Sequence, residues 1–223
     1  MIQKVFLDFA GVSVNKDFSQ QATEFMSGVI EKVQNAFEGS NVVIVTEQPD
    51  SGDYTRIDVT NSIKDGETYL GEADYDTSFD PNDEGVVRLD NLLKVGEDSN
   101  LTSYQTSNLV ASNICHETAH TLGVDHSDDP SNLMYPSAPS NDLNSPPSFT
   151  EGQMSQMDAH AALSNFSPDD PSAISPFPEE DYSEGRIDDG FNPLEDDFPV
   201  ENDESDTIEP QDAQDDGSLF DLL

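Results

Sequence analysis

The spacing of apolar and polar residues divides the first 166 residues into strands and helices. Residues 2–9 alternate apolar and polar side chains, which is the period of a half-buried strand. Residues 18–38 instead place apolar side chains three and four positions apart, which predicts a core-facing helix that Gly39 ends. Four shorter segments have the length and composition of strands, namely 42–45, 54–59, 68–76 and 86–89.

Two further helices begin at recognisable N-terminal caps. Thr102 and Gln105 form the Thr-x-x-Gln pattern, in which each side chain bonds the other residue's backbone N–H group. The same pattern recurs at Thr150 and Gln153 and predicts a last helix through about Leu163. Residues 1–166 are therefore predicted to form one α/β (α+β) domain with five strands and three helices.

The composition changes after Phe166. Residues 167–223 hold 20 of the 47 acidic residues, seven prolines and a single base, Arg186. Because such a segment has few apolar side chains, it cannot bury enough surface to offset the entropy lost on ordering. We therefore predict one folded domain over residues 1–166, followed by a disordered acidic tail.

The formal net charge of the chain is −39, which bears on its partners. Nucleic acids and anionic membranes both bind clustered Lys and Arg, so the composition argues against both. No apolar run is long enough to span a membrane. Two explanations of the acidity stay open: adaptation to high salt, or an ordinary acidic extracellular protein. The single cysteine, Cys115, excludes an intrachain disulfide and is expected to be a small packed side chain.

Most of the chemistry in the sequence lies in one stretch, NICHETAHTLGVDHS. His116 and His120 are one helical turn apart on the same face, so both imidazoles can reach one metal ion. Glu117 can hold a water on that metal without being a ligand itself. Gly123 can adopt a left-handed conformation, which ends the helix and brings His126 round as a third nitrogen ligand. Three protein ligands with one open position are typical of a catalytic zinc site.

This spacing, H-E-x-x-H-x-x-G-x-x-H, resembles the zinc-binding motif of the metzincin proteases. The segment Leu133-Met134-Tyr135-Pro136 resembles the Met-turn that follows the motif in that family. Met134 comes eight residues after His126, and a serine directly follows this histidine. Both features resemble the matrixin branch more than astacins, adamalysins or serralysins. The resemblance is specific over residues 112–136 and looser over 2–166.

The resemblance implies a metzincin-like fold with a twisted five-stranded mixed sheet, two long helices and a C-terminal helix below the cleft. It implies zinc-dependent endoproteolysis, with Glu117 as general base and Met134 as packing under the ligands. In the family an edge strand pairs with the extended substrate, and this chain has candidate residues for that strand and for the segment after the Met-turn. The implied substrate-binding residues are Leu70, Gly71, Glu72, Ala73 and Pro136.

A second function stays open beside the zinc endopeptidase. It is a catalytically silent zinc-binding module that presents its acidic tail to partners. The presence of Glu117 favours the enzyme, because a silent module needs the three ligands but no base. Whether the peptidase is general or restricted in specificity stays open. For Tyr135 we expect a structural role, although a tyrosine near this turn binds metal in some metzincins.

Further expectations concern other parts of the molecule, its partners and its location. Residues 80–85 resemble the start of a calcium loop, but Asn91 stands where a bidentate Glu is expected, so a solvated acidic loop is the default and Ca²⁺ only a candidate. His160 has no ligand partners at metal spacing and is expected to be structural. The resemblance implies a protein or peptide substrate and an extracellular location, although no signal peptide precedes the first strand. The expected state is a monomer.

Overall fold

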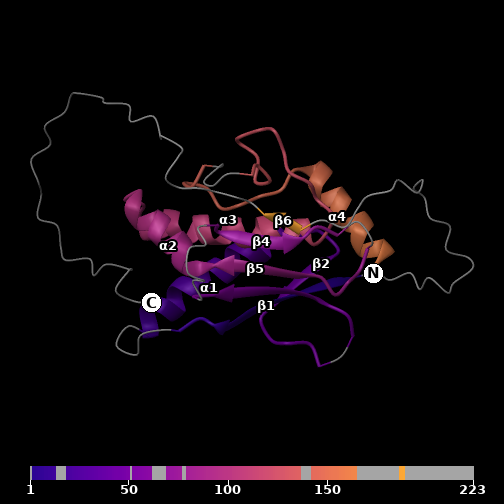
Figure 1. Cartoon of the computed structure of the whole chain (residues 1–223), viewed down its shortest axis with the longest axis horizontal. Coiled ribbons are helices and arrows are strands. Elements are labelled where there is room, and N and C mark those ends of the chain that lie inside the picture. Colours follow the sequence, from indigo (N-terminus) through magenta and orange to yellow (C-terminus); the bar gives the residue numbers. More distant parts are fainter. Residues whose placement is uncertain are drawn as a thin grey trace, which may run out of the picture.

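The computed structural model describes residues 2–13, 19–50, 52–61, 69–76, 79–136, 142–164 and 186–188. These residues form a mixed sheet of six strands with four helices (Figure 1). The strands are β1 (Gln3–Gly11), β2 (Val42–Val45), β3 (Thr55–Thr60), β4 (Gly71–Asp74), β5 (Glu84–Arg88) and β6 (Arg186–Asp188). The helices are α1 (Ser19–Ala36), α2 (Leu89–Asp98), α3 (Ser103–His120) and α4 (Glu151–Leu163).

The strand order in the sheet is β2-β1-β3-β5-β4-β6. Strands β2, β1, β3 and β5 are parallel neighbours, and α1 provides the crossover that a parallel pair requires between β1 and β2. Strand β4 instead pairs antiparallel with β5 on one side and with β6 on the other. The antiparallel end of the sheet is therefore built from β5, β4 and β6.

One face of the sheet is apolar and carries the helices. In β3 the side chains of Ile57 and Val59 are fully buried, whereas the intervening Asp58 is half-buried on the other face. Helix α3 packs into this core along most of its length, and 14 of its 18 residues are buried. This burial holds the side chains of α3 in place. Cys115 on α3 is fully buried, as expected, and burial raises the pKa of its thiol.

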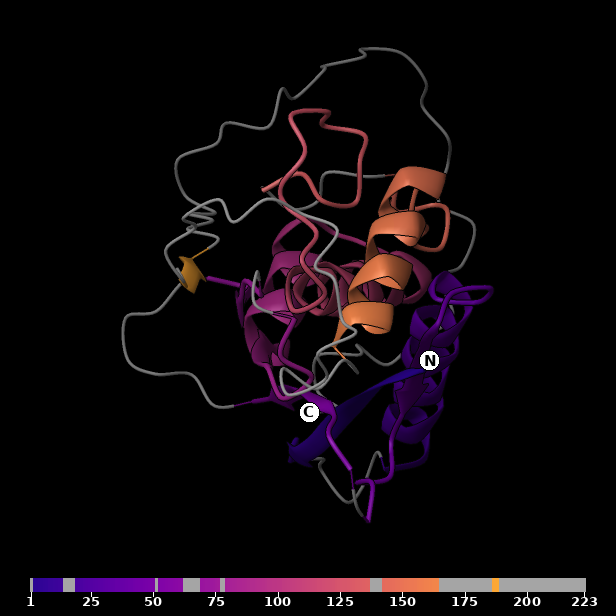
Figure 2. The same cartoon turned by 90° about the vertical axis from the view of Figure 1, so that its right-hand side faces the viewer.

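Helix α4 lies beside the end of α3 and contacts β2 at one end of the sheet (Figure 2). Its residue Gln156 donates a hydrogen bond to the backbone oxygen of Gly123, which follows α3. Both predicted capping boxes form, at Thr102 for α3 and at Thr150 for α4. No helix in the described part of the chain combines the length and apolar character needed to cross a membrane.

All five predicted strands and all three predicted helices are present, with ends shifted by at most three residues. Helix α2 was missed, although Leu89, Leu92 and Leu93 have helical spacing. It begins directly after β5, and its N-cap residue Arg88 makes no capping hydrogen bond with its side chain, so the sequence lacks the usual start signal.

Strand β6 lies in the tail for which the sequence predicts disorder. For residues 186–188 the structure shows a strand paired with β4 instead. The remaining residues of the tail lie outside the described residues, so the boundary at Phe166 stays a prediction. A three-residue strand carries little sequence signal, because its stability depends on the edge that it pairs with.

Candidate metal and active site

Three histidine side chains converge at the C-terminal end of α3. The ligand atoms of His116, His120 and His126 all lie within 4.8 Å of one another. Nε2 of His120 is 3.0 Å from Nε2 of His116 and 3.1 Å from Nε2 of His126. Within the described ranges this is the single group of three or more His, Cys, Asp or Glu side chains that could hold a metal ion. The structure thus brings together the three histidines that the motif spacing predicts.

Backbone carbonyls orient two of these imidazoles. Nδ1 of His116 is 2.9 Å from the oxygen of Leu133, and Nδ1 of His120 is 2.8 Å from the oxygen of Val124. Because a carbonyl oxygen can only accept, we assign the proton to Nδ1 in both rings, which leaves each Nε2 with a lone pair toward the centre. Two lone pairs at 3.0 Å repel each other unless a cation lies between them.

The donor set fits a zinc ion. Zinc binds imidazole nitrogens at about 2.0–2.1 Å in a tetrahedral arrangement, which places ligand nitrogens about 3.3 Å apart. The observed separations between Nε2 of His120 and its two neighbours, 3.0 and 3.1 Å, are close to this value. His120 is fully buried and His126 is half-buried, so the group opens toward solvent on the side of His126.

Gly123 allows the chain to turn back after α3. Its φ angle is +72°, in the left-handed region, and its N–H donates to the oxygen of His120 at 2.9 Å. A Cβ at this position would lie 3.0 Å from the backbone oxygen of Asp76 and 3.3 Å from Cδ2 of His160. Backbone conformation and space therefore both favour glycine here, as the sequence predicts, and the turn carries His126 back to the other two histidines.

The segment around Met134 forms a tight turn next to the histidines. The N–H of Ser127 donates to the oxygen of Met134 at 2.8 Å, and Oδ1 of Asn132 accepts from the N–H of Met134 at 2.8 Å. Gln153 of α4 donates to the same Asn132 oxygen at 2.8 Å. Met134 is fully buried, and the neighbouring Leu133 supplies the carbonyl that holds His116. The turn therefore fixes a metal-binding ring through its backbone.

Glu117 is fully buried between α3 and β4. A Cβ added to Gly71 would lie 2.3 Å from its Oε1 and 2.6 Å from its Cδ, so the carboxyl group packs directly on the backbone of β4. Further along, the ring of Tyr75 is 6.3 Å from the ring of His120, and the N–H of Asp76 donates to the oxygen of His120 at 3.3 Å. The segment from β4 to Asp76 therefore runs alongside the metal-binding turn of α3.

The residues predicted to bind substrate differ in their exposure. Leu70 and Ala73 are buried and belong to the interior, whereas Glu72 is half-buried. Arg88 is 3.8 Å from the carboxylate of Glu72. Pro136, the last described residue after the turn at Met134, is exposed. The apolar side chains of Leu70 and Ala73 are therefore not accessible, and the backbone edge of β4 is paired with β6.

A buried pair next to the site was not predicted. Nε2 of His160 is 2.8 Å from Oδ2 of Asp76, and both side chains are 2% exposed. The ring of His160 also packs against Phe79 at a centroid distance of 5.3 Å. The expected structural role of His160 agrees with these contacts. Its partner is 84 residues away, so no local pattern could have identified it.

The loop before β5 shows no second metal site. Oδ1 of Asp80 accepts from the backbone N–H of Asn82 at 2.9 Å and from its side-chain amide at 3.0 Å, so the loop closes on its own groups. Burial and the nearby carboxylate of Asp76 raise the pKa of Asp83 to about 8. No other group able to hold a metal occurs among the residues described, and calcium therefore gains no support.

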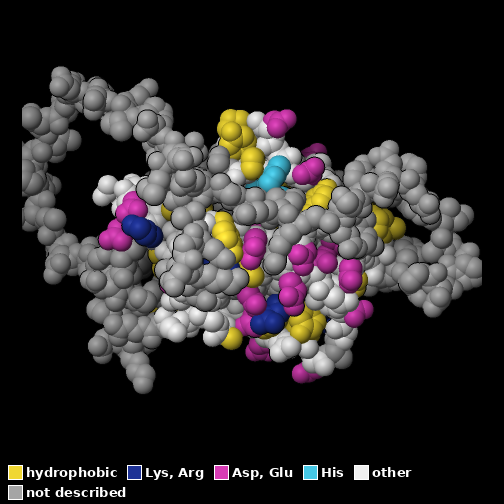
Figure 3. Space-filling view, viewed as in Figure 1, with side chains coloured by type: hydrophobic (Ala, Val, Ile, Leu, Met, Phe, Trp, Pro, Cys, Tyr) yellow, Lys and Arg dark blue, Asp and Glu magenta, His cyan; other side chains and the backbone are white. Residues whose placement is uncertain are grey.

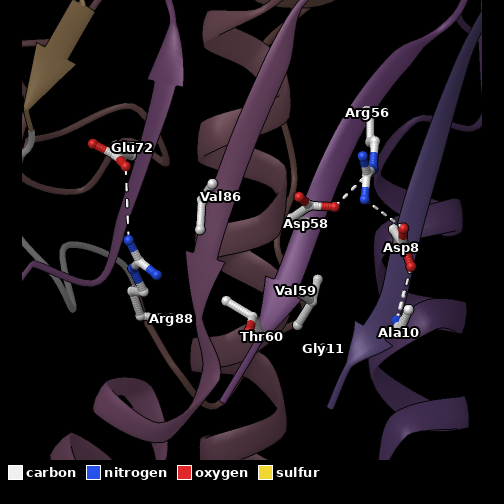
Figure 4. Close-up of a pocket in the computed structure, with 10 residues that line it drawn as sticks. All are labelled: Asp8, Ala10, Gly11, Arg56, Asp58, Val59, Thr60, Glu72, Val86 and Arg88. Carbon is white, nitrogen blue, oxygen red and sulfur yellow. Dashed lines mark hydrogen bonds and ion pairs between the residues drawn. The ribbon is translucent and has the colours of Figure 1, made fainter. Parts of the chain in front are cut away.

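The opposite face of the sheet carries a polar hollow of about 420 Å³ (Figure 4). Arg56 makes 2.8 Å ion pairs with Asp8 and with Asp58, and Arg88 lies on the other side beside Glu72. The charged side chains of the hollow thus pair with one another. The sheet separates the hollow from the histidines, since α3 passes behind the strands in this view. We conclude that the hollow is not part of the metal centre.

On the described part of one face of the molecule, acidic side chains are spread out rather than gathered at the histidine. On the face that Figure 3 shows, Asp and Glu side chains are scattered widely and Lys and Arg are few. A histidine surface is visible near the upper edge of the same face, between apolar and acidic side chains. A broad distribution of this kind affects solubility and salt response more than substrate choice.

No curated protein sequence matches this chain, whereas several solved structures are similar to it. Archaemetzincin from Methanopyrus kandleri has 15% identity, a TM-score of 0.47 and coverage of 71% of this chain and 95% of its own. Archaemetzincin from Archaeoglobus fulgidus, complexed with malonate, has 20% identity, a TM-score of 0.41 and coverage of 69% and 99%. A zinc-dependent peptidase from Methanocorpusculum labreanum has 13% identity, a TM-score of 0.46 and coverage of 69% and 98%.

The family of the chain is shown by a family model and not by these structural likenesses. The model of the matrixin peptidases matches residues 7–160, which is more than half of the chain. The matched region contains all three converging histidines, the buried Glu117 and the turn at Met134. The chain therefore belongs to the matrixin family of zinc metallopeptidases, within the metzincins that its sequence resembles.

Proposed function

We propose that the chain is an endopeptidase that cleaves extended polypeptides, with Glu117 as general base and the edge of β4 as the strand that aligns the substrate. One observation carries this proposal. Glu117 directly follows His116 in the sequence, and its buried carboxyl group packs on the backbone of Gly71 in β4. A peptide bond held along that strand is thereby close to both the base and the metal-binding rings.

Three histidines, His116, His120 and His126, would hold the metal. When bound by His116, His120 and His126, zinc supplies Lewis-acid chemistry that lowers the pKa of a water and polarises a carbonyl oxygen. The carbonyls of Leu133 and Val124 keep two of the rings in the tautomer whose Nε2 lone pair can bind a metal. These carbonyl contacts favour metal binding because the rings need not reorient.

Glu117 moves the proton in the proposed reaction. Its carboxylate accepts a proton from the attacking water and then donates that proton to the nitrogen of the leaving amine. This route forms no acyl-enzyme. The only thiol of the chain, Cys115, is fully buried with its pKa raised by burial, so it is no candidate nucleophile.

Backbone pairing is the proposed basis of substrate alignment. An edge strand offers N–H and C=O groups to a peptide of any sequence, and the pairing places successive peptide bonds in a fixed register. Because Leu70 and Ala73 are buried, their side chains cannot select a substrate. Selection by sequence then depends on groups beyond β4, including the segment near the exposed Pro136.

Cleavage of an unfolded casein-type protein, analysed by mass spectrometry, tests the proposed function. We expect internal cuts that a zinc chelator abolishes and that added zinc restores. His120→Ala should lose both zinc and cleavage, because the fully buried His120 lies between the other two rings. If the zinc-loaded parent chain leaves unfolded proteins and a broad peptide library intact, the silent zinc-binding module is correct instead.

A further inference from the structure

The outer edge of β4 carries a strand from the C-terminal tail. Strand β6 pairs with it antiparallel, and Figure 1 draws the two side by side at the end of the sheet. The other neighbour of β4 is β5, so β4 would be the edge strand if β6 were removed. The register partners are Arg186 with Asp74, Ile187 with Ala73 and Asp188 with Glu72.

We propose that the outer edge of β4 is a docking surface for one extended strand, and that the chain's own residues 186–188 are its resident occupant. A peptide substrate has to displace this segment before it can pair with β4. The proposal rests on the proposed function, because it places the substrate on the same edge. It adds an intramolecular competitor that belongs to the same chain.

The position of the docked strand makes competition unavoidable. Neighbouring strands lie about 4.8 Å apart, and an edge can accept only one strand at a time because each outward N–H and C=O pairs once. The occupied stretch begins at Glu72, directly after the glycine on which Glu117 packs. It ends at Asp74, directly before Tyr75, which contacts His120. A strand docked there therefore pairs with the same stretch of β4 that the proposed substrate alignment uses.

The charges along the register favour this particular segment. Arg186 is the single base among residues 167–223, and its register partner Asp74 is exposed and acidic. The rest of the tail is strongly acidic, so an acidic domain repels it. The register partner of Asp188 is Glu72, which has Arg88 at 3.8 Å. The register thus places the single base of residues 167–223 opposite an acidic residue of the edge.

The length of the tether predicts the strength of the competition. From Leu163 to Arg186 an extended chain can span roughly 75 Å, so reach does not limit docking. Because docking is intramolecular, its effective concentration is on the order of millimolar. Three residues of backbone pairing bind weakly, but the high effective concentration offsets this weakness. We therefore expect the edge to be occupied for most but not all of the time. If about 80–90% of molecules are docked, the apparent KM rises about 5–10-fold while kcat is unchanged.

Proline substitution in the full-length chain tests the proposal. Ile187→Pro removes the backbone N–H at the middle of β6 and should undock it. Ile208→Pro makes the same substitution elsewhere in the tail and serves as the matched control. Amide hydrogen exchange of segment 184–190 within the full-length protein reports docking. The KM and kcat for cleavage of fluorescence-quenched peptides report competition. A synthetic peptide of residues 183–192 tests docking in trans.

In the parent and in Ile208→Pro, we expect the peptide 184–190 to be protected from exchange. Ile187→Pro should lose this protection, and its KM should be about 5–10-fold lower than that of the parent with kcat unchanged. The synthetic peptide should inhibit the Ile187→Pro variant competitively. Exchange in the parent as fast as in the free peptide would overturn the docking. An undocked Ile187→Pro with the parent's KM would overturn the competition.

Failure of the proposed function has a different signature. In that case no variant cleaves any peptide, although each binds zinc, and the exchange measurement still decides whether residues 186–188 dock on β4. Loss of protection in Ile187→Pro but not in Ile208→Pro would then support the docking surface alone. Equal exchange in both variants and in the free peptide would overturn it.

Discussion

Replacing Gly71 with alanine should slow the chemical step without removing zinc. The new Cβ would lie 2.3 Å from Oε1 of Glu117 and 2.7 Å from its Cγ. Non-bonded heavy atoms are stable at about 3.5 Å or more, so the carboxyl group has to shift by about 1 Å. Glu117 is fully buried, and its side chain therefore cannot move freely into solvent. A displacement of about 1 Å in a catalytic group costs on the order of 10²-fold in rate.

The assay separates positioning of the base from folding and from metal binding. For Gly71→Ala we expect kcat to fall about 30–100-fold, with KM within about twofold of the parent and zinc retained at about one per chain. Gly28→Ala is the matched control, because a Cβ at Gly28 meets nothing within 4 Å. A Gly71→Ala protein with the parent's kcat at the same zinc content would refute the close packing of Glu117 on β4.

Two further predictions concern stability. Because the pKa of Asp83 is raised to about 8 in the folded chain from an ordinary value of 3.8, the unfolded chain loses this proton first, and the contribution of Asp83 to stability falls as pH rises from about 4 to 8. The thermal midpoint of Asp83→Asn minus that of the parent should therefore increase as pH rises over this range. A difference between the two midpoints that does not change with pH would contradict this prediction. The parent's midpoint should also rise from 0.1 to 2 M NaCl, since salt shortens the screening length from about 10 Å at 0.1 M to about 3 Å at 1 M. A matched sucrose series controls for excluded-solute effects, and a flat or falling midpoint would remove the high-salt explanation of the acidity.

Local signals predicted the parts of the fold that a few neighbouring residues determine. The capping boxes at Thr102 and Thr150 place the starts of α3 and α4, because each box is complete within four residues. The convergence of the histidines also follows from local geometry. A helical turn separates His116 from His120, and Gly123 supplies the left-handed residue that returns the chain.

Contacts between distant segments could not be predicted in the same way. The packing of Glu117 on Gly71 and the buried pair of His160 with Asp76 each join residues far apart in the chain. Helix α2 lacks a side-chain cap, and β6 is too short to show a periodic pattern. Its pairing depends on the outward edge of β4, which exists only after the sheet has formed.

Replacing Glu117 with glutamine tests the proposed mechanism most directly. The substitution keeps the shape of the side chain and all three histidines but removes the basic carboxylate. Glu117→Gln should retain zinc at about one per chain and lose cleavage of an unfolded protein by about 10²–10⁴-fold. The exposed Glu97→Gln on α2 is the matched control and should cleave like the parent. Cleavage by zinc-loaded Glu117→Gln at the rate of the parent would contradict the assignment of Glu117 as general base.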